Sequence, residues 1–215
     1  MIRPRTFCTR VLSLVALALV VMVGCQQSSW QQLAKPPDKP IQIVSTVGGV
    51  RVQTESGAFY LCAAQECQPV TFTLPAAGVS RVFTTLFYQD KDQLIVQGKD
   101  GRIYVCRFDG CEPKDWLVPD GNIVAAYYGG TVKGGYFLIA DGNTAQADFC
   151  DAAKCGPGIL DGVRFAAPLS QTPPLPPGRV RERFVLDYSP PEGSGQSQLL
   201  LMEDGTLWSW HGTKQ

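Results

Sequence analysis

The cysteines are the residues of this chain whose type and spacing suggest chemistry most directly. Six of the eight form three pairs with four residues between the members: Cys62 and Cys67, Cys106 and Cys111, Cys150 and Cys155. Two thiols at this separation can form a disulfide across a hairpin or supply metal ligands. Zinc sites gather four ligands, whereas these pairs are far apart in the sequence and the chain has one histidine. The spacing therefore favours three local disulfides over a metal site, and we expect no cofactor.

Catalytic groups are scarce. A histidine-based triad or a multi-histidine metal site would depend on His211, the only histidine, which we expect to be a surface residue beside Trp210. Ser194 is not in a nucleophile-elbow motif. Asp90 and Asp92 lack the accompanying glycine and glutamate of a calcium loop. We therefore predict no catalytic residue and no enzyme activity.

The cysteine pairs recur at a constant interval, which indicates an internal repeat. Cys62, Cys106 and Cys150 are each 44 residues apart. Residues 56–62, Ser-Gly-Ala-Phe-Tyr-Leu-Cys, align with residues 100–106, Asp-Gly-Arg-Ile-Tyr-Val-Cys. A fourth copy at 204–210 lacks cysteine and has Trp210 in the cysteine column. The repeats therefore span about 41–79, 80–120, 121–164 and 180–212.

Short strand-like segments separated by turn residues fill each repeat. In the second repeat they are 82–88, 94–97, 102–106 and a last strand near 116–118, with Asp-Gly between the second and third. In the third strands we expect burial to alternate, with Ile103, Val105, Leu207 and Ser209 on one side and Tyr104 and Trp208 on the other. Four strands in about 40–50 residues are typical of a propeller blade. The predicted fold class is all-β, a small β-propeller-like domain over 41–215 with disulfide-stapled hairpins.

The last repeat ends before its own fourth strand. Residues 204–212, Asp-Gly-Thr-Leu-Trp-Ser-Trp-His-Gly, resemble one blade motif of the RCC1-type propeller family, a match that implies no function here. Residues 29–36 resemble the last-strand region 114–119, so an N-terminal strand is one candidate to complete the ring. The alternative is that residues 25–40 form a flexible tether.

The first 25 residues combine a basic start (Arg3, Arg5 and Arg10), an apolar run at 11–23 and the tetrapeptide Met22-Val23-Gly24-Cys25. This arrangement resembles a bacterial lipoprotein signal peptide, although Met22 departs from the usual Leu, Val or Ile. The resemblance implies that residues 1–24 are removed, that Cys25 carries palmitate or another acyl chain, and that the protein is membrane-anchored through this lipid. Gln26, which is not aspartate, implies the outer membrane, facing the periplasm, rather than the inner membrane. An oxidising envelope would also preserve disulfides.

Composition excludes several classes. Lys plus Arg and Asp plus Glu both number 19, so the basic footprint of a nucleic-acid-binding protein is absent. The apolar run at 11–23 is shorter than a membrane-spanning helix, and no second run of about 18 apolar residues follows it. About 190 residues remain after the signal, enough for a substantial core.

Two groups of residues are candidates for an interaction surface. Tyr60, Tyr104 and Trp208 share one column of the repeat, where they either pack between blades or form an aromatic binding surface. The second group is the proline-rich segment with Pro173, Pro174, Pro176 and Pro177, which is either a polyproline ligand for another protein or a spacer.

Together these observations predict an envelope lipoprotein. We expect a non-catalytic scaffold or adaptor with protein partners in a secretion or outer-membrane assembly complex. The alternatives are a glycan- or peptide-binding module and, third, an envelope hydrolase.

Overall fold

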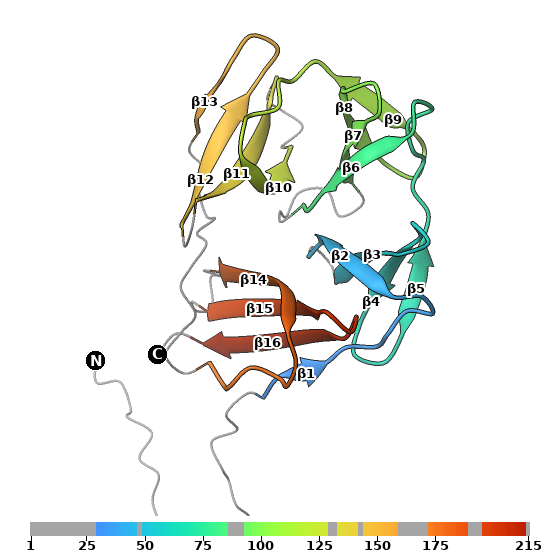
Figure 1. Cartoon of the computed structure of the whole chain (residues 1–215), viewed down its shortest axis with the longest axis vertical. Helices are drawn as coiled ribbons and strands as arrows, with labels where there is room; N and C mark the ends of the chain where they lie inside the picture. The colour runs from blue at the N-terminus through green and yellow to red at the C-terminus, as the bar shows by residue number, and fades with distance from the viewer. Residues whose placement is uncertain are drawn as a thin grey trace, which may run out of the picture.

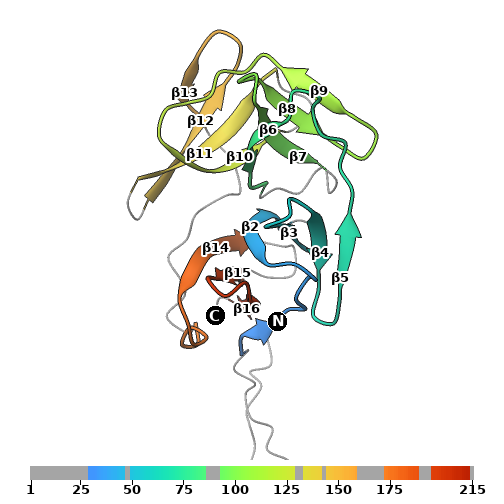
Figure 2. The same cartoon turned by 45° about the vertical axis from the view of Figure 1, so that its right-hand side comes forward.

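A computed structural model describes residues 29–46, 49–85, 93–128, 133–141, 144–158, 172–188 and 195–213. These residues form four antiparallel sheets of four strands each. The sheets are arranged as blades around a common centre (Figure 1), and a view turned by 45° shows the same four sheets from one side (Figure 2). The predicted all-β, four-bladed propeller-like fold is confirmed.

Each blade runs in chain order from an inner to an outer strand, except that the outer strand of blade 4 comes from the N-terminus. Blade 1 is β2 (Pro40–Ser45), β3 (Val50–Thr54), β4 (Phe59–Cys62) and β5 (Cys67–Val70). Blade 2 is β6 (Val79–Phe83), β7 (Leu94–Gly98), β8 (Ile103–Cys106) and β9 (Cys111–Lys114). Blade 3 is β10 (Asn122–Tyr127), β11 (Gly135–Asp141), β12 (Thr144–Cys150) and β13 (Cys155–Pro157). Blade 4 is β14 (Val180–Tyr188), β15 (Gly195–Met202), β16 (Leu207–Thr213) and β1 (Gln31–Gln32).

The N-terminal strand β1 completes blade 4 and closes the ring. Gln31 pairs with Ser209 and Gln32 with Trp208, and Leu33 N–H donates to Leu207 O at 2.9 Å. The next residue of the linker, Ala34, donates its N–H to Ala63 O of blade 1 at 2.8 Å. Residues 31–34 therefore join the last blade to the first, as a closing strand rather than a free tether.

The second and third strands of blades 1, 2 and 4 are joined by the same turn. Its glycine, Gly57, Gly101 or Gly205, has φ between 83° and 85°, a left-handed conformation that favours glycine. In blade 2 the turn is closed by a hydrogen bond from Gly98 N–H to Arg102 O at 2.8 Å. These are the hairpin turns predicted from the Asp-Gly and Ser-Gly dipeptides.

The three predicted disulfides are present. Cys62–Cys67, Cys106–Cys111 and Cys150–Cys155 each link directly opposed residues of the third and fourth strands of one blade. The expected position of the fourth strand of blade 2, near 116–118, is wrong, because that strand is Cys111–Lys114. Its sequence, Cys-Glu-Pro-Lys, does not resemble a strand, but an outer edge strand tolerates proline and exposed charge.

The predicted alternation of burial along the third strands is confirmed. In β8, Ile103 and Val105 are buried and Tyr104 is half-buried. In β16, Leu207 and Ser209 are buried and Trp208 is half-buried. The inward residues pack between neighbouring sheets, so that buried clusters combine blades 1 and 2, blades 2 and 3, and blade 4 with blades 1 and 3.

The connections between blades carry a proline repeat. Pro36, Pro75, Pro119 and Pro176 are buried, and each precedes the first strand of the next blade. Thr73, two residues before Pro75, donates its N–H to Arg107 O at 3.0 Å. Leu117, two residues before Pro119, donates its N–H to Asp151 O, also at 3.0 Å. Ala34, two residues before Pro36, makes the equivalent bond. At the connection between blades 3 and 4 this position is Pro174, which has no N–H to donate.

Candidate functional site

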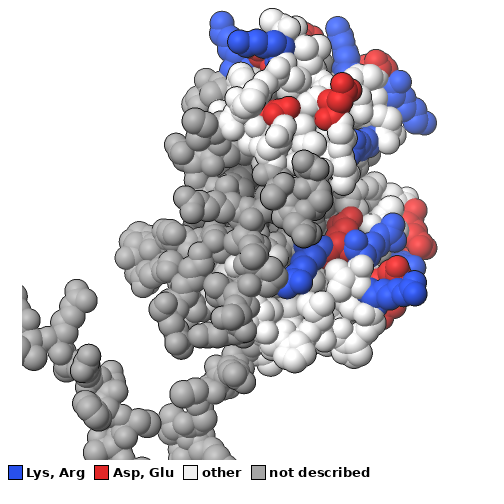
Figure 3. Space-filling view, turned by 60° about the vertical axis from the view of Figure 1, so that its left-hand side comes forward, with Lys and Arg blue, Asp and Glu red and all other residues white. Residues whose placement is uncertain are grey.

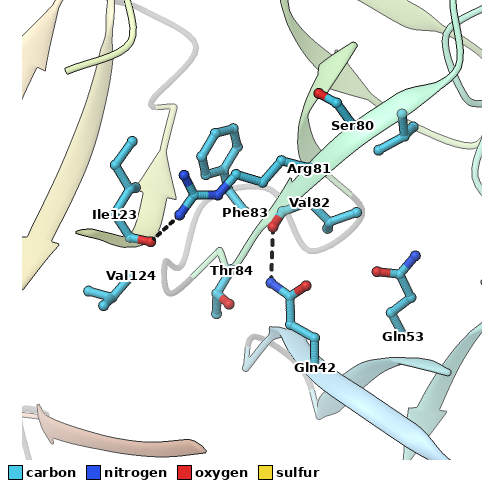
Figure 4. Close-up of a pocket in the computed structure, with 10 residues that line it drawn as sticks. Gln42, Gln53, Ser80, Arg81, Val82, Phe83, Thr84, Ile123 and Val124 are labelled. Carbon is cyan, nitrogen blue, oxygen red and sulfur yellow. Dashed lines mark hydrogen bonds between the residues drawn. The ribbon is translucent and has the colours of Figure 1, made fainter. Parts of the chain in front are cut away.

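The inner strands of blades 1, 2 and 3 meet at a polar cleft, which we call the axial cleft. It has a volume of about 370 Å³. Gln42 and Gln53 line it from blade 1, Ser80, Arg81 and other residues of 79–84 from blade 2, and Ile123 and Val124 from blade 3. Figure 4 shows Arg81 reaching from β6 toward Ile123, and Gln42 reaching from β2 toward Val82.

Each inner strand has a β-bulge at the same position, and in blades 1 and 2 the residue after it, Gln42 or Arg81, lines the axial cleft. The residue that follows the bulge is Gln42, Arg81, Ala125 or Glu182. Three of these four side chains contact the backbone of the next blade: Glu182 Oε2 accepts from Ile43 N–H at 2.9 Å, Gln42 Nε2 donates to Val82 O at 3.0 Å, and Arg81 Nη2 donates to Ile123 O at 2.7 Å. Ala125 has no polar group, so the seam between blades 3 and 4 lacks this contact.

Backbone hydrogen bonds hold the inner strands of blades 1 to 3 together beneath the cleft. Thr85 N–H donates to Val44 O and Ala126 N–H donates to Thr84 O, both at 2.8 Å. The Thr84 hydroxyl donates to Ile43 O at 2.6 Å. The cleft therefore has a rigid base, because its walls are fixed to one another through main-chain atoms.

Burial raises the pKa of Glu182 above its ordinary value of 4.5, and the hydrogen bond from Ile43 N–H opposes this shift. A single main-chain donor does not fully replace the water lost by a buried carboxylate. The Glu182 carboxylate is thus engaged at the seam between blades 4 and 1, and it is not among the residues that line the cleft.

A second cleft, the lateral cleft, lies between blades 2 and 3 and has a volume of about 560 Å³. The Trp116 and Tyr128 rings in it are 5.1 Å apart, and Lys114 Nζ lies 4.7 Å from the centre of the Tyr128 ring. Lys114 also forms an ion pair with Glu112 at 2.5 Å. Trp116 is only 8% exposed, so it packs the seam between the blades rather than presenting a flat aromatic surface.

The three aromatic residues of the predicted interaction column lie in different blades and do not form one cluster. Tyr60 and Tyr104 are half-buried opposite Pro69 and Pro113 of the outer strands, and Trp208 is opposite Gln32. The Tyr104 hydroxyl donates to Asp100 Oδ2 at 2.6 Å. This hydrogen bond raises the pKa of Tyr104 and lowers that of Asp100.

The predicted proline-rich surface divides into two kinds of position. Pro176 is buried in the proline repeat of the connections, whereas Pro174 and Pro177 are exposed. Pro173 is half-buried, and its carbonyl accepts a hydrogen bond from Trp30 Nε1 at 3.3 Å. One of the four prolines therefore has a structural role shared by every blade.

The remaining predicted residues are placed as follows. Cys25 lies outside the described residues. His211 is exposed on β16 opposite Ser197. Among the residues that the structure describes, no group of three or more His, Cys, Asp or Glu side chains is arranged to hold a metal ion.

Sequence reasoning missed the axial cleft, although a signal for it exists. Gln42, Arg81, Ala125 and Glu182 each follow one of the four connection prolines by six residues. Alignment on these prolines, instead of on the cysteines, would have shown a column that is polar in three of four repeats.

In comparisons with protein-family models, curated proteins and solved structures, nothing matches this chain. The RCC1-like resemblance of residues 204–212 therefore stays a prediction.

Proposed function

We propose that this protein is a lipid-anchored, non-catalytic adaptor of the bacterial cell envelope, held at the outer membrane by an acylated Cys25 and facing the periplasm. Its propeller presents a fixed surface to protein partners in a larger assembly. The observation that carries this proposal is the position of β1, which begins at Gln31, six residues after Cys25.

Only a short length of chain separates Cys25 from strand β1 of the propeller. Six residues span at most about 20 Å when fully extended. The lipid on Cys25 therefore keeps the closing edge of blade 4 within about that distance of the bilayer surface. The described residues include no helix long and apolar enough to cross a membrane.

The character of the surface fits a partner-binding role better than a nucleic-acid-binding one. Lys and Arg side chains are interspersed with Asp and Glu over the part of the surface coloured in Figure 3. This distribution agrees with the equal numbers of acidic and basic residues in the whole chain. A mixed surface of this kind provides specificity through local charge pairs rather than through one long-range field.

A second candidate function is a peptide- or glycan-binding module. The axial cleft favours it, because its carboxamide and guanidinium groups are the kind of polar side chains that orient a small ligand. An envelope hydrolase stays in third place.

The anchor is tested by intact-mass analysis of the mature protein purified from membranes. Acylated Cys25 at the N-terminus is the expected result, and the Cys25→Ser variant should accumulate as an unprocessed precursor. A soluble protein cleaved at another residue would refute the lipoprotein assignment.

The adaptor role is tested by chemical crosslinking in intact cells, followed by affinity purification of the anchored protein. A partner recovered in stoichiometric amount from wild-type cells, and lost in the Cys25→Ser strain, supports the role. Recovery of the anchored protein alone, at native expression level, would refute it.

A further inference from the structure

The axial cleft contains the guanidinium of Arg81, which is held in place and has no ion pair with a carboxylate of the described residues. Arg81 donates one N–H to Ile123 O at 2.7 Å, and its Cζ lies 4.9 Å from the centre of the Phe83 ring. The side chain as a whole is exposed. Among the described residues, no carboxylate forms an ion pair with Arg81. A guanidinium has five N–H donors, so most of them are available to a ligand.

The neighbouring polar groups complement this cation. Gln42 uses one of its two amide hydrogens on Val82 O, and the side-chain amide of Gln53 makes no hydrogen bond within the described part of the chain. Two carboxamides that line the same cleft therefore offer further donors. Ser80 has its hydroxyl within 3.0 Å of Gln97 O and of Gly98 O, so its proton is already used.

The fixed position of the Arg81 side chain lowers the conformational entropy that is lost when a ligand binds. A free arginine side chain loses rotamer freedom when it binds a ligand. Here the hydrogen bond to Ile123 and the contact with Phe83 restrict the side chain before a ligand arrives. The planar fork of a guanidinium then matches the two oxygens of a carboxylate in a bidentate pair, which is stronger than a neutral hydrogen bond.

We infer that the axial cleft is a carboxylate-binding site, with Arg81 as its cation and Gln42 and Gln53 as additional donors. This inference rests on the proposed adaptor function for the source of the ligand, which is an acidic side chain or C-terminal carboxylate of a partner protein. A free small carboxylic acid presents the same chemistry.

The test uses the full-length anchored protein in detergent micelles and measures binding by calorimetry. The probes are acetylated tetraglutamate, the matching tetraglutamine peptide, glutarate and inorganic phosphate. We expect tetraglutamate to bind and tetraglutamine not to bind. Arg81→Gln should weaken tetraglutamate binding roughly ten- to a hundredfold, the usual range for loss of a charge-assisted hydrogen bond. Arg81→Lys should recover only part of this loss, because an ammonium group lacks the planar fork.

A matched control is Arg102→Gln, which removes an exposed arginine of the same blade that does not line the cleft. Its affinity for tetraglutamate should equal that of the wild type. Thermal unfolding of all variants shows whether Arg81→Gln leaves the fold intact. If Arg81→Gln unfolds the protein, the affinity of the Arg81→Lys variant for tetraglutamate still tests the inference. Equal binding by wild type and both Arg81 variants, binding of phosphate but not carboxylates, or no binding of any carboxylate would each overturn the inference.

The outcomes for the site and for the adaptor role can be told apart. A partner that is recovered equally well with wild type and Arg81→Gln would refute the cleft as the partner-binding site and leave the adaptor role standing. Glutarate binding that depends on Arg81, combined with no recovered partner, would refute the adaptor role and assign the cleft to small acids.

Discussion

Blade 4 has a tryptophan pair where the other blades have a disulfide. The register that pairs Gln31 with Ser209 places Trp30 opposite Trp210, and Trp210 occupies the column of Cys62 and Cys106. The two rings are 6.4 Å apart, and Trp210 is 3% exposed. We predict that the double variant Trp30→Cys/Trp210→Cys forms a fourth disulfide, one that covalently closes the ring.

The magnitude follows from the loop that this bond would close. The existing disulfides each close six residues, for which the chain-entropy estimate is about 2 kcal/mol, whereas a link from position 30 to position 210 closes about 180 residues and gives about 5 kcal/mol. Loss of the tryptophans lowers the free energy of unfolding, by about 3–5 kcal/mol for the buried Trp210 and by less for Trp30, which is half-buried. The appropriate reference is therefore Trp30→Ser/Trp210→Ser, which loses the same rings without gaining a bond.

We expect the oxidised dicysteine protein to unfold roughly 10–20 °C above the diserine protein, since each kcal/mol shifts the midpoint by about 2–4 °C for a domain of this size. Non-reducing peptide mapping should recover the peptides of positions 30 and 210 as one linked species. Free thiols at both positions in the folded protein, or equal midpoints for the two variants, would show that these positions are not opposed and that β1 does not close the ring in this register.

Three further changes test the core, the seam and the histidine. Ile103→Asp should unfold the domain, measured by circular dichroism, because a fully buried position would hold an unpaired charge and the lost apolar side chain alone costs about 2–5 kcal/mol; a folded variant would contradict the predicted strand orientation. Glu182 has a raised pKa in the folded state, so its contribution to stability is fully present below the unfolded carboxyl pKa and is lost as pH rises through the folded pKa. The Glu182→Gln variant cannot ionise at this position, so its free energy of unfolding relative to wild type should be higher at pH 7 than at pH 4, measured by urea titration. An equal free-energy difference between the two proteins at both pH values would rule out titration at this seam. His211→Ala should change the free energy of unfolding by less than about 0.5 kcal/mol and leave partner recovery unchanged; loss of function in a folded, anchored variant would instead place the histidine in an active site.

The cysteine spacing carried most of what could be predicted about the fold. Directly opposed residues at the end of a hairpin fix the disulfide pairing, so Cys106 and Cys111 predicted the pairing and the turn of the outer hairpin of blade 2. The outer strand itself was misplaced toward Trp116. An edge strand needs no alternation of apolar residues, and Trp116 is apolar because it packs between blades.

The axial cleft could not be predicted from the cysteine alignment. It depends on β-bulges that shift each inner strand by one residue, and a bulge leaves no fixed residue type in the sequence. In the cysteine alignment Arg81 does not stand out from the other arginines of the chain. Its distinguishing feature, the bond to Ile123 O of the next blade, arises only when the ring brings residues of different repeats together.

Ring closure by β1 imposes an order on folding. The ribosome makes β1 first and its partner strand β16 last, whereas each disulfide hairpin involves residues close together in the sequence. The hairpins can thus fold early, and closure waits for a contact across nearly the whole chain, which is slow for entropic reasons. Until then the edge of β16 is open to any extended segment, including β1 of a neighbouring copy. Exchange of this strand between two chains would preserve the β1–β16 pairing of blade 4 and produce a dimer joined at the edges of its fourth blades.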